Sequence, residues 1–414
     1  VLYHEESGLL VVACAPIMLP PNSQSSVGLI RFYHLESFEL EFEFELTTSC
    51  TIASLCCMEL NLLEKHLCIV AGTTDLIEKE LDPSEGRILL FEIFPSAQKG
   101  KCVKLRDVST DLGGCVSFVH PYKDRILAAV NNKLAIYLPQ SSKSLLNTIS
   151  SFSRCILHSE KLQCEAWHST NVWITGVDVK DEIILVGDVH SSVSVFRYDS
   201  SLKAFTELCR DNKTLWTMDV CCLTPDLYLV TDSFCNFTLF KRNKESPLSN
   251  DRARLAVVGM FHHSESINRF IPGSLSSCKL TLWEKKSLAM KGITPAAEYL
   301  WGSAEGGMGV VLSLKGKKQF QRFLFLQKAI CSTVVGFGDL NHEQWRNFHN
   351  ESGTLDHCGF IDGNLIEYFL LFPQVLQVEI FESLQSILAE ENSIPLYATL
   401  QELIEEIQDL QGLH

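Results

Sequence analysis

Two short clusters in this 414-residue chain contain residue types that could carry enzyme chemistry. His262 and His263 stand beside Ser264 and Glu265, a set that suggests a nucleophile, a base and an acid. Adjacent residues on one strand or loop point apart, so this spacing makes a poor catalytic triad. Residues 305–309 (EGGMG) could pass for a phosphate loop, but no Lys-Ser/Thr pair follows and strand formers come next. We expect a tight hairpin turn there and no enzymatic activity.

The sixteen cysteines are scattered, and several lie inside strand-like runs, such as Cys56-Cys57, Cys68 and Cys221-Cys222. No C-x-x-C pair is present, and no His/Cys cluster has the spacing of a zinc site. The nearest, His357-Cys358, consists of two adjacent residues. We expect thiols that act as small core hydrophobes in a reducing compartment, with no bound metal and no cofactor.

The elements that would position any functional residue follow from a repeated strand pattern. Residues 182–198 (EIILVGDVHSSVSVFRY) and 226–242 (DLYLVTDSFCNFTLFKR) each contain strand formers, a polar turn and a second alternating run, and they start 44 residues apart. Looser copies lie at 66–94, 125–138 and 299–314. A period of about 40–45 residues with several strands per unit is typical of propeller blades. One blade cannot bury both its faces, so the units must stack radially.

Each unit is expected to contain four antiparallel strands. In the clearest unit the expected strands are 171–180, 182–189, 191–198 and 204–210. Six units are visible and a seventh is suspected, with strands that could come from outside the chain. The prediction is a mainly β fold, with a seven-bladed, WD40-like β-propeller over residues 1–319. A pair of β-sandwiches is the alternative, although sandwiches do not usually keep one four-strand order over five copies.

After about residue 319 the hydrophobic period lengthens from that of strands to that of helices. Helices are expected over residues 320–330, 341–350, 365–372, 375–389 and 396–410. Asp362 or Asn364 could cap the third of these. Trp345 is expected to pin the helical segment to the propeller. Residues 320–414 are therefore predicted to form a small α-helical C-terminal domain.

The net charge of −15 is unevenly distributed. Residues 355–414 contain eleven Asp or Glu and no Lys or Arg, whereas the rest of the chain is close to neutral. Neither part has the clustered positive charge of a phosphate-binding surface, although the strip at 315–318 (KGKK) keeps direct nucleic-acid binding open. The acidic face of the last helix is either a solvated surface or a docking surface for a basic partner. No apolar run approaches the ~18 residues of a membrane span, no signal peptide is visible, and the start at Val1 suggests a piece of a longer protein.

Several motifs resemble one protein family in their order and spacing. The stretches QWRNFHNE at 344–351 and GFIDGNLIEYFL at 359–370 resemble a region shared by two large proteins. These are the A subunit of the cleavage and polyadenylation specificity factor and, closer in likeness, the large subunit of the damage-specific DNA-binding protein. VGMFHHSESINRFIPGSL and WGSAEGGMGVVLSL match as well. The resemblance implies the third propeller of a three-propeller scaffold, followed by a helical tail.

The resemblance also implies a function. Its members are non-catalytic interaction scaffolds of nuclear complexes, including the adaptor of a cullin-type ubiquitin ligase that acts in DNA-damage recognition and repair. The implied partners are substrate-receptor-like or processing-complex proteins, together with the first and second propellers of the same full-length protein. No membrane is involved, and the implied location is the nucleus, with the cytoplasm as a second compartment. The alternative is a nucleic-acid-binding subunit of a pre-mRNA cleavage, polyadenylation or splicing complex.

Three residues match positions on the partner-binding rim of the family: Asn171, Trp216 and Asn268. Trp216 is the candidate anchor, because a few aromatic side chains dominate interface energies. Packing between blades is the alternative role for Trp216.

The expected rim also departs from the family at three positions. Ser191 stands where the damage-binding subunit has an arginine, and Thr175 and Gly176 replace a larger apolar and an aromatic residue. These changes remove size and charge from the rim, so we expect a divergent paralogue with partners of its own.

Overall fold

The protein is described by a computed structural model that covers residues 1–4, 7–15, 27–47, 49–61, 65–77, 80, 83–95, 101–108, 112–139, 162–170, 172–273, 299–314, 317–336, 338, 340–350, 353–390, 397 and 399–412. These residues form two compact units, Val1–Trp216 and Thr217–His414. Each unit has hydrophobic clusters of its own.

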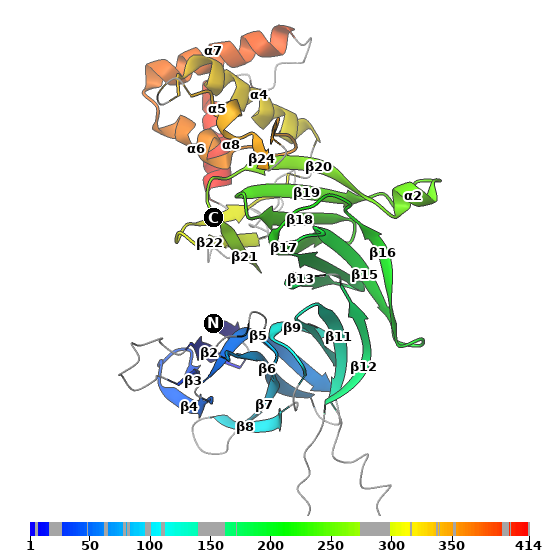
Figure 1. Ribbon diagram of the computed structural model, residues 1–414. Coiled ribbons are helices and arrows are strands. Elements are labelled where there is room, and N and C mark those ends of the chain that lie inside the picture. The colour runs from blue at the N-terminus through cyan, green and yellow to red at the C-terminus, as the bar shows by residue number, and fades with distance from the viewer. Residues whose placement is uncertain are drawn as a thin grey trace, which may run out of the picture. The chain divides into compact units, whose positions relative to one another are not determined.

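The first unit contains four antiparallel sheets, each made of four strands that follow one another in the chain (Figure 1). Their strands are β1 Leu2–His4, β2 Leu9–Cys14, β3 Leu29–His34 and β4 Leu40–Glu45; β5 Cys50–Asn61, β6 Lys65–Asp75, β7 Ile88–Pro95 and β8 Lys101–Val108; β9 Val116–Tyr122, β10 Arg125–Val130, β11 Lys133–Pro139 and β12 Leu162–Ser169; and β13 Ile174–Lys180, β14 Ile183–Asp188, β15 Val193–Asp199 and β16 Ala204–Arg210.

The second sheet buries both of its faces against neighbouring sheets. In β6, Cys68 and Val70 pack with the third sheet, whereas Ile69 and Ala71 pack with the first. This follows from the two-residue period of a strand, which sends successive side chains to opposite faces. A sheet that is apolar on both sides needs two neighbours, which is the arrangement of propeller blades.

The second unit contains two more blades and all the long helices of the described residues. Its strands are β17 Thr217–Thr224, β18 Leu227–Asp232, β19 Asn236–Arg242 and β20 Leu255–His262 in the fifth blade, and β21 Ile267–Pro272, β22 Tyr299–Ser303 and β23 Met308–Val311 in the sixth. The two blades share a core in which Leu229 and Phe237 pack with Ile267, Phe270 and Tyr299.

The described residues therefore form a mainly β fold with six blades in a β-propeller arrangement, which corrects the predicted number of seven. The sixth blade has three strands among the described residues. After Val311 the alternating pattern ends, and a helix begins at Lys317 instead of a further strand. The physical reason is the change of hydrophobic period, which favours a helix over a new blade.

The helical tail is built on α4 (Lys317–Thr333), α7 (Gln374–Glu390) and α8 (Leu400–Gln411), close to the predicted helices. Figure 1 shows them gathered with α6 (Gly363–Tyr368). The remaining elements are the short α2 (Ser249–Arg252), α5 (His342–Trp345) and η2 (Phe369–Leu371), and the hairpin of β24 (Phe348–Asn350) and β25 (Gly353–Leu355).

One predicted helix is largely wrong. Residues 341–350 form the single turn α5 and then the strand β24, because Phe348–Asn350 pairs with β25. The tail has its own core, in which Leu326 of α4 packs in one cluster with Leu384 of α7 and Ile407 of α8. The predicted domain boundary between residues 319 and 320 stays a prediction.

None of the cysteines whose side chains the structure places forms a disulfide. Cys56, Cys68 and Cys221 are buried among apolar side chains. Burial raises the pKa of Cys50 to about 11, and this keeps its thiol protonated at neutral pH. The buried thiols thus act as small core residues, as expected from their positions inside strands, whereas Cys164 and Cys358 are exposed.

Candidate interaction surfaces

Trp216 is an exposed aromatic residue on an ordered backbone. It directly precedes β17, and 55% of its surface is accessible. The amide of the neighbouring Leu215 donates to the carbonyl oxygen of His190 at 3.2 Å, and Leu215 forms a parallel bridge with Ser191. The tryptophan therefore stands beside the β14–β15 turn with more than half of its surface accessible. An accessible aromatic on a fixed backbone suits an interface anchor.

The β14–β15 turn is held by one carboxylate. Oδ1 of Asp188 accepts hydrogen bonds from the amides of His190 (2.8 Å) and Ser191, and the amide of Asp188 donates to the carbonyl of Ser192 at 3.0 Å. The fifth blade repeats the device, since Oδ1 of Asp232 accepts from the amide of Phe234 at 2.9 Å. The aspartates of the two repeated motifs thus order equivalent turns.

Asn268 lies on β21, where Ile267 and Phe270 are buried and Asn268 is exposed. The strand is tied to the fifth blade, because Oγ1 of Thr231 donates to the carbonyl of Ile267 at 3.0 Å and the amide of Phe270 donates to Asp219 Oδ2 at 2.6 Å. The third predicted rim residue, Asn171, lies outside the described residues. That the three residues belong to one rim therefore stays a prediction.

The three positions predicted to depart from the family are all on blade four. Thr175 is half-buried and Gly176 is buried in β13, and Ser191 is half-buried in the turn ordered by Asp188. The short side chains of Thr175 and Ser191, and Gly176 with none, do not project as an arginine or an aromatic would.

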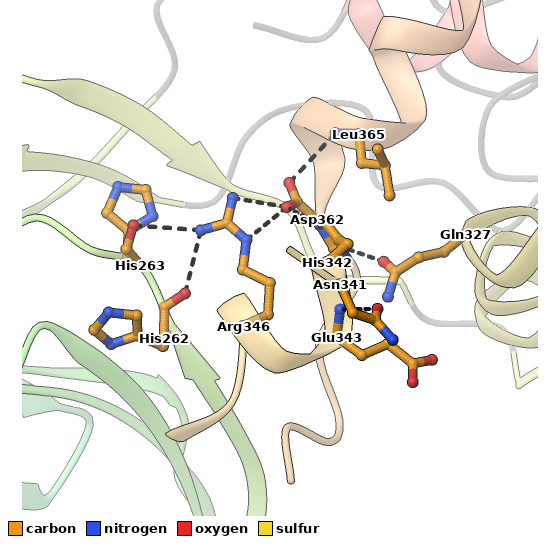
Figure 2. Close-up of polar contacts among 9 residues, drawn as sticks. All are labelled: His262, His263, Gln327, Asn341, His342, Glu343, Arg346, Asp362 and Leu365. Atoms are coloured by element: carbon orange, nitrogen blue, oxygen red, sulfur yellow. Dashed lines mark hydrogen bonds and ion pairs between the residues drawn. The ribbon is translucent and has the colours of Figure 1, made fainter. Parts of the chain in front are cut away.

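A buried polar cluster joins the helical tail to the fifth blade (Figure 2). Its centre is Arg346, at the end of α5, whose Nε and Nη2 both lie 2.7 Å from Oδ2 of Asp362. The same guanidinium donates through Nη1 to the carbonyl oxygens of His262 (3.2 Å) and His263 (3.3 Å) at the end of β20. One arginine thus binds both a carboxylate of the tail and two backbone carbonyls next to the blade.

Asp362 uses both oxygens and its own amide. Oδ1 caps α6 by accepting from the amide of Leu365 at 3.3 Å, and Oδ2 is also 2.8 Å from Nε2 of His342. The Asp362 amide donates to Oε1 of Gln327 on α4 at 2.9 Å. Burial alone would raise the pKa of Asp362, but the His342 hydrogen bond and the Arg346 charge lower it to about 2. The carboxylate therefore stays ionised at neutral pH, opposite the arginine.

A second polar link joins the β18–β19 turn to the β24–β25 hairpin. Nδ2 of Asn236 donates to the carbonyl of His349 at 2.6 Å, and Oδ1 of Asn236 accepts from the amide of His349 at 3.2 Å. Asn236 also donates to Oδ2 of Asp232 at 2.9 Å, and burial raises the pKa of Asp232 to about 6. The side chain of Asn236 thus makes the same pair of hydrogen bonds to the backbone of the hairpin that a neighbouring strand would make.

The third link is apolar. The ring of Phe360 lies 6.2 Å from that of Phe237 and 5.8 Å from that of Phe261, measured between centroids. Backbone hydrogen bonds pair Met260 with Cys358 at 2.8 and 2.9 Å. Gly359 has a φ of +71°, and a Cβ there would lie 2.4 Å from the carbonyl oxygen of Val258. Only glycine permits this close approach of the tail to β20.

An open polar hollow of about 450 Å³ lies beside this cluster, between α4 and α5. Its lining consists of Leu324, Gln327, Lys328, Asn341, Glu343, Gln344, Asn347, Asp356 and His357. Most of these side chains are amides or charged groups, and Asn341 is itself used to cap α5 by accepting from the amide of Glu343 at 3.0 Å. Within the described part of the chain, no three His, Cys, Asp or Glu side chains are placed to hold a metal ion.

Sequence reasoning gave Asp362 or Asn364 as the cap of α6, and the cap is Asp362; its pairing with Arg346 was missed. It assigned the pinning role to Trp345, whose side chain is 40% exposed and whose ring lies 3.7 Å from Cζ of Arg346. The tryptophan covers the guanidinium, and the buried arginine makes the link. The motif QWRNFHNE contained the residue but nothing in its spacing indicated the partner.

The comparison with known families decides where this arrangement belongs. The sequence model of the family described as "CPSF A subunit region" matches residues 24–371. The chain belongs to this family. The predicted resemblance is thereby confirmed. The matched residues include every strand from β3 to β25 and the tail as far as η2. They leave out β1 and β2 of the first blade, and α7 and α8 of the tail.

Three similar proteins are members known from plants. DNA damage-binding protein 1b of Arabidopsis thaliana is 28% identical over 415 residues, covering 100% of this chain and 34% of the relative. DNA damage-binding protein 1a of the same plant is 27% identical over 414 residues, covering 99% of this chain and 34% of the relative. DNA damage-binding protein 1 of Solanum lycopersicum is 29% identical over 418 residues, with the same two shares. The chain spans about a third of the length of these CPSF A family relatives.

A helix that crosses a lipid bilayer must be both long and apolar. No described helix of this family member combines the length and the apolar character needed to cross one.

Proposed function

We propose that this chain is a non-catalytic protein-interaction scaffold of a nuclear complex, comparable to the adaptor of a cullin-type ubiquitin ligase in DNA-damage recognition. Membership of the CPSF A subunit family and the names of the relatives, DNA damage-binding proteins, support the proposal. The observation that carries it is Trp216, more than half exposed on a backbone fixed by the turn of blade four. A pre-ordered aromatic loses little entropy when a partner covers it.

In this proposal the blades form one propeller over residues 1–319, and the helical domain of residues 320–414 is attached to it. Asn171, Trp216 and Asn268 lie on the rim that receives a helix of a substrate receptor or a processing factor. Two further propellers of the same full-length protein complete the scaffold. The main site of action is the nucleus. The small residues Ser191, Thr175 and Gly176 give the rim its own choice of partner.

The test is affinity purification of the full-length protein followed by quantitative mass spectrometry, with four single variants. We expect Trp216→Ala and Asn268→Ala to reduce a specific partner at least tenfold. Trp167→Ala is the matched control, since Trp167 lies on β12 and is 63% exposed. Asn243→Ala, an exposed residue after β19, is the control for Asn268. Recovery of a cullin would support the ligase role, whereas full retention of every partner by both rim variants would reject the rim.

A nucleic-acid-binding subunit of a pre-mRNA cleavage, polyadenylation or splicing complex is the second candidate. The description of the matched family and the strip KGKK at 315–318 favour it. Lys315 lies outside the described residues, so the strip enters this proposal from the sequence alone. A salt titration with labelled single-stranded RNA and DNA decides, because phosphate contacts weaken steeply with salt. The absence of binding at low salt would reject direct binding by this chain.

A further inference from the structure

Four apolar side chains stand exposed within eleven residues of the helical tail. The accessible fractions are 57% for Tyr368, 74% for Leu371, 72% for Val375 and 40% for Val378. We call these four residues the α7 patch. Single exposed apolar residues are ordinary, but a run of them on one short segment marks an interaction site.

The α7 patch is presented on a rigid corner. The opposite face of α7 is already used, because Ile380, Leu384 and Leu388 are buried in the core of the tail. At the corner between η2 and α7, Nε2 of the buried Gln377 donates to the carbonyl of Phe369 at 2.9 Å. The exposed valines are therefore on the free side of a helix whose other side and whose start are both fixed.

The surroundings of the α7 patch are acidic. Glu379 and Glu382 are exposed and stand four residues after Val375 and Val378, so each lies on the same face as one valine. No Lys or Arg occurs from residue 355 to the end of the chain. On the neighbouring α4, Nη1 of Arg322 lies 3.8 Å from Glu406 of α8, and Nζ of Lys328 lies over the ring of Phe325 at 5.8 Å.

We propose that the α7 patch is a docking surface for a basic amphipathic helix of a partner protein. Val375 and Val378, about one turn apart on α7, would meet the apolar face of such a helix, and its Lys or Arg residues would flank it opposite Glu379 and Glu382. A second copy of the chain is a poorer occupant, because two identical acidic surfaces would repel one another. An anionic membrane is disfavoured for the same reason.

This surface is independent of the proposed rim. The family region matched in the chain ends at residue 371, so Val375 and Val378 lie beyond it, whereas Tyr368 and Leu371 lie within it. The tail would bind a partner of its own in addition to the partner bound by the rim.

The test uses the purified 414-residue chain and a fluorescein-labelled, 18-residue Leu/Lys amphipathic peptide, with a Leu/Glu peptide of the same pattern and a scrambled Leu/Lys peptide. We expect saturable binding of the Leu/Lys peptide alone in fluorescence anisotropy. The double variant Val375→Gln/Val378→Gln should weaken this binding at least tenfold. The control Ser386→Gln/Ala389→Gln, at exposed positions further along α7, should leave it within twofold. Unchanged thermal melting of all variants shows that the fold is intact.

Charge reversal separates the electrostatic part of the proposal. Glu379→Lys/Glu382→Lys should abolish binding of the Leu/Lys peptide and admit the Leu/Glu peptide. Equal binding of the scrambled peptide, or no effect of the valine variant, would overturn the proposal. Sedimentation equilibrium that showed a dimer broken by the valine variant would assign the patch to a second copy instead. Full-length protein that fails to bind the peptide while the 414-residue chain binds it would assign the patch to another part of the same polypeptide.

Discussion

The guanidinium of Arg346 lies 2.7 Å from the carboxylate of Asp362, and the two side chains are only 4% and 5% accessible. The pair joins the end of α5 to the cap of α6, and Arg346 continues to the carbonyls of His262 and His263. Removing either member leaves the other charged and shielded from water. Such an uncompensated charge is far more costly than the pair itself is stabilising.

Asp362→Asn and Arg346→Met are each expected to lower the free energy of unfolding of residues 217–414 by about 3–5 kcal/mol. The double variant should lose less than the sum, because it leaves no unpaired charge. Urea denaturation followed by fluorescence measures the change. Lys244→Met is the control, since its ion pair with Asp226 is largely exposed and should contribute less than about 1 kcal/mol. Strict additivity of the two single variants would contradict a direct pairing.

Asn236→Ala tests the link to the hairpin. The variant leaves the backbone groups of His349 without their side-chain partner, which should cost about 1–3 kcal/mol. Hydrogen exchange of the β24–β25 amides should become faster, while exchange in blade four stays unchanged. The exposed Asn364→Ala should stay within about 0.5 kcal/mol of wild type. Unaltered exchange in the hairpin of Asn236→Ala would show that other contacts hold it.

His262 predicts a specific dependence of stability on pH. Burial, and then the nearby His349 and Arg346, lower its pKa from 6.5 to about 4. Below pH 6.5 the imidazole of His262 is protonated in the unfolded chain, whereas in the folded chain it is protonated only below about pH 4. The free energy of unfolding therefore decreases as the pH falls through this window. His262 is only partly buried, and after allowance for solvent screening the effect is on the order of 1 kcal/mol.

The variant His262→Gln should therefore lose less stability than wild type between pH 6.5 and 4. Asp232 has the opposite sign, because its pKa is raised to about 6 and its contribution is lost as the pH rises from 3.8 toward that value. It is present in both proteins, and its effect cancels in the difference. Parallel stability curves for wild type and His262→Gln would refute the assignment.

Gly359→Ala should destabilise the attachment of the tail by several kcal/mol. The new Cβ would lie 2.4 Å from the carbonyl oxygen of Val258, and the φ of +71° is strained for alanine. Gly363→Ala is the matched control, since nothing lies within 4 Å of a Cβ at the start of α6. Denaturation of the two variants side by side gives the answer, and equal stability would show that the chain can relax at Gly359.

Most of the strands and helices could be predicted from the local hydrophobic periodicity of the sequence. The strand Ala204–Arg210 was predicted at its observed bounds, because its alternation of exposed and covered residues leaves a two-residue period. The seventh blade was wrong, since after Val311 the chain changes its period. The helix predicted over residues 341–350 was wrong because Phe348–Asn350 pairs with β25 as a strand. Helical propensity, which is a local property, does not reveal this pairing.

The junction was less accessible to sequence reasoning. Asp362 could be recognised as a cap because the capped amide is three residues away. Its ion pair with Arg346 spans 16 residues, and the bond between Asn236 and His349 spans 113. No local periodicity records such contacts, so a single sequence does not reveal them.

The bond between Arg346 and the His262 carbonyl spans 84 residues. The chain thus leaves the fifth blade, builds the sixth blade and α4, and returns to the residue where it left. This hydrogen bond therefore links the two ends of the segment from His262 to Arg346. The entropic cost of closing a loop grows only by about 0.6 kcal/mol for each doubling of its length. Insertions between β21 and β22 would therefore destabilise the link between Arg346 and His262 very little. The chain could therefore be longer between these two strands without loss of the junction.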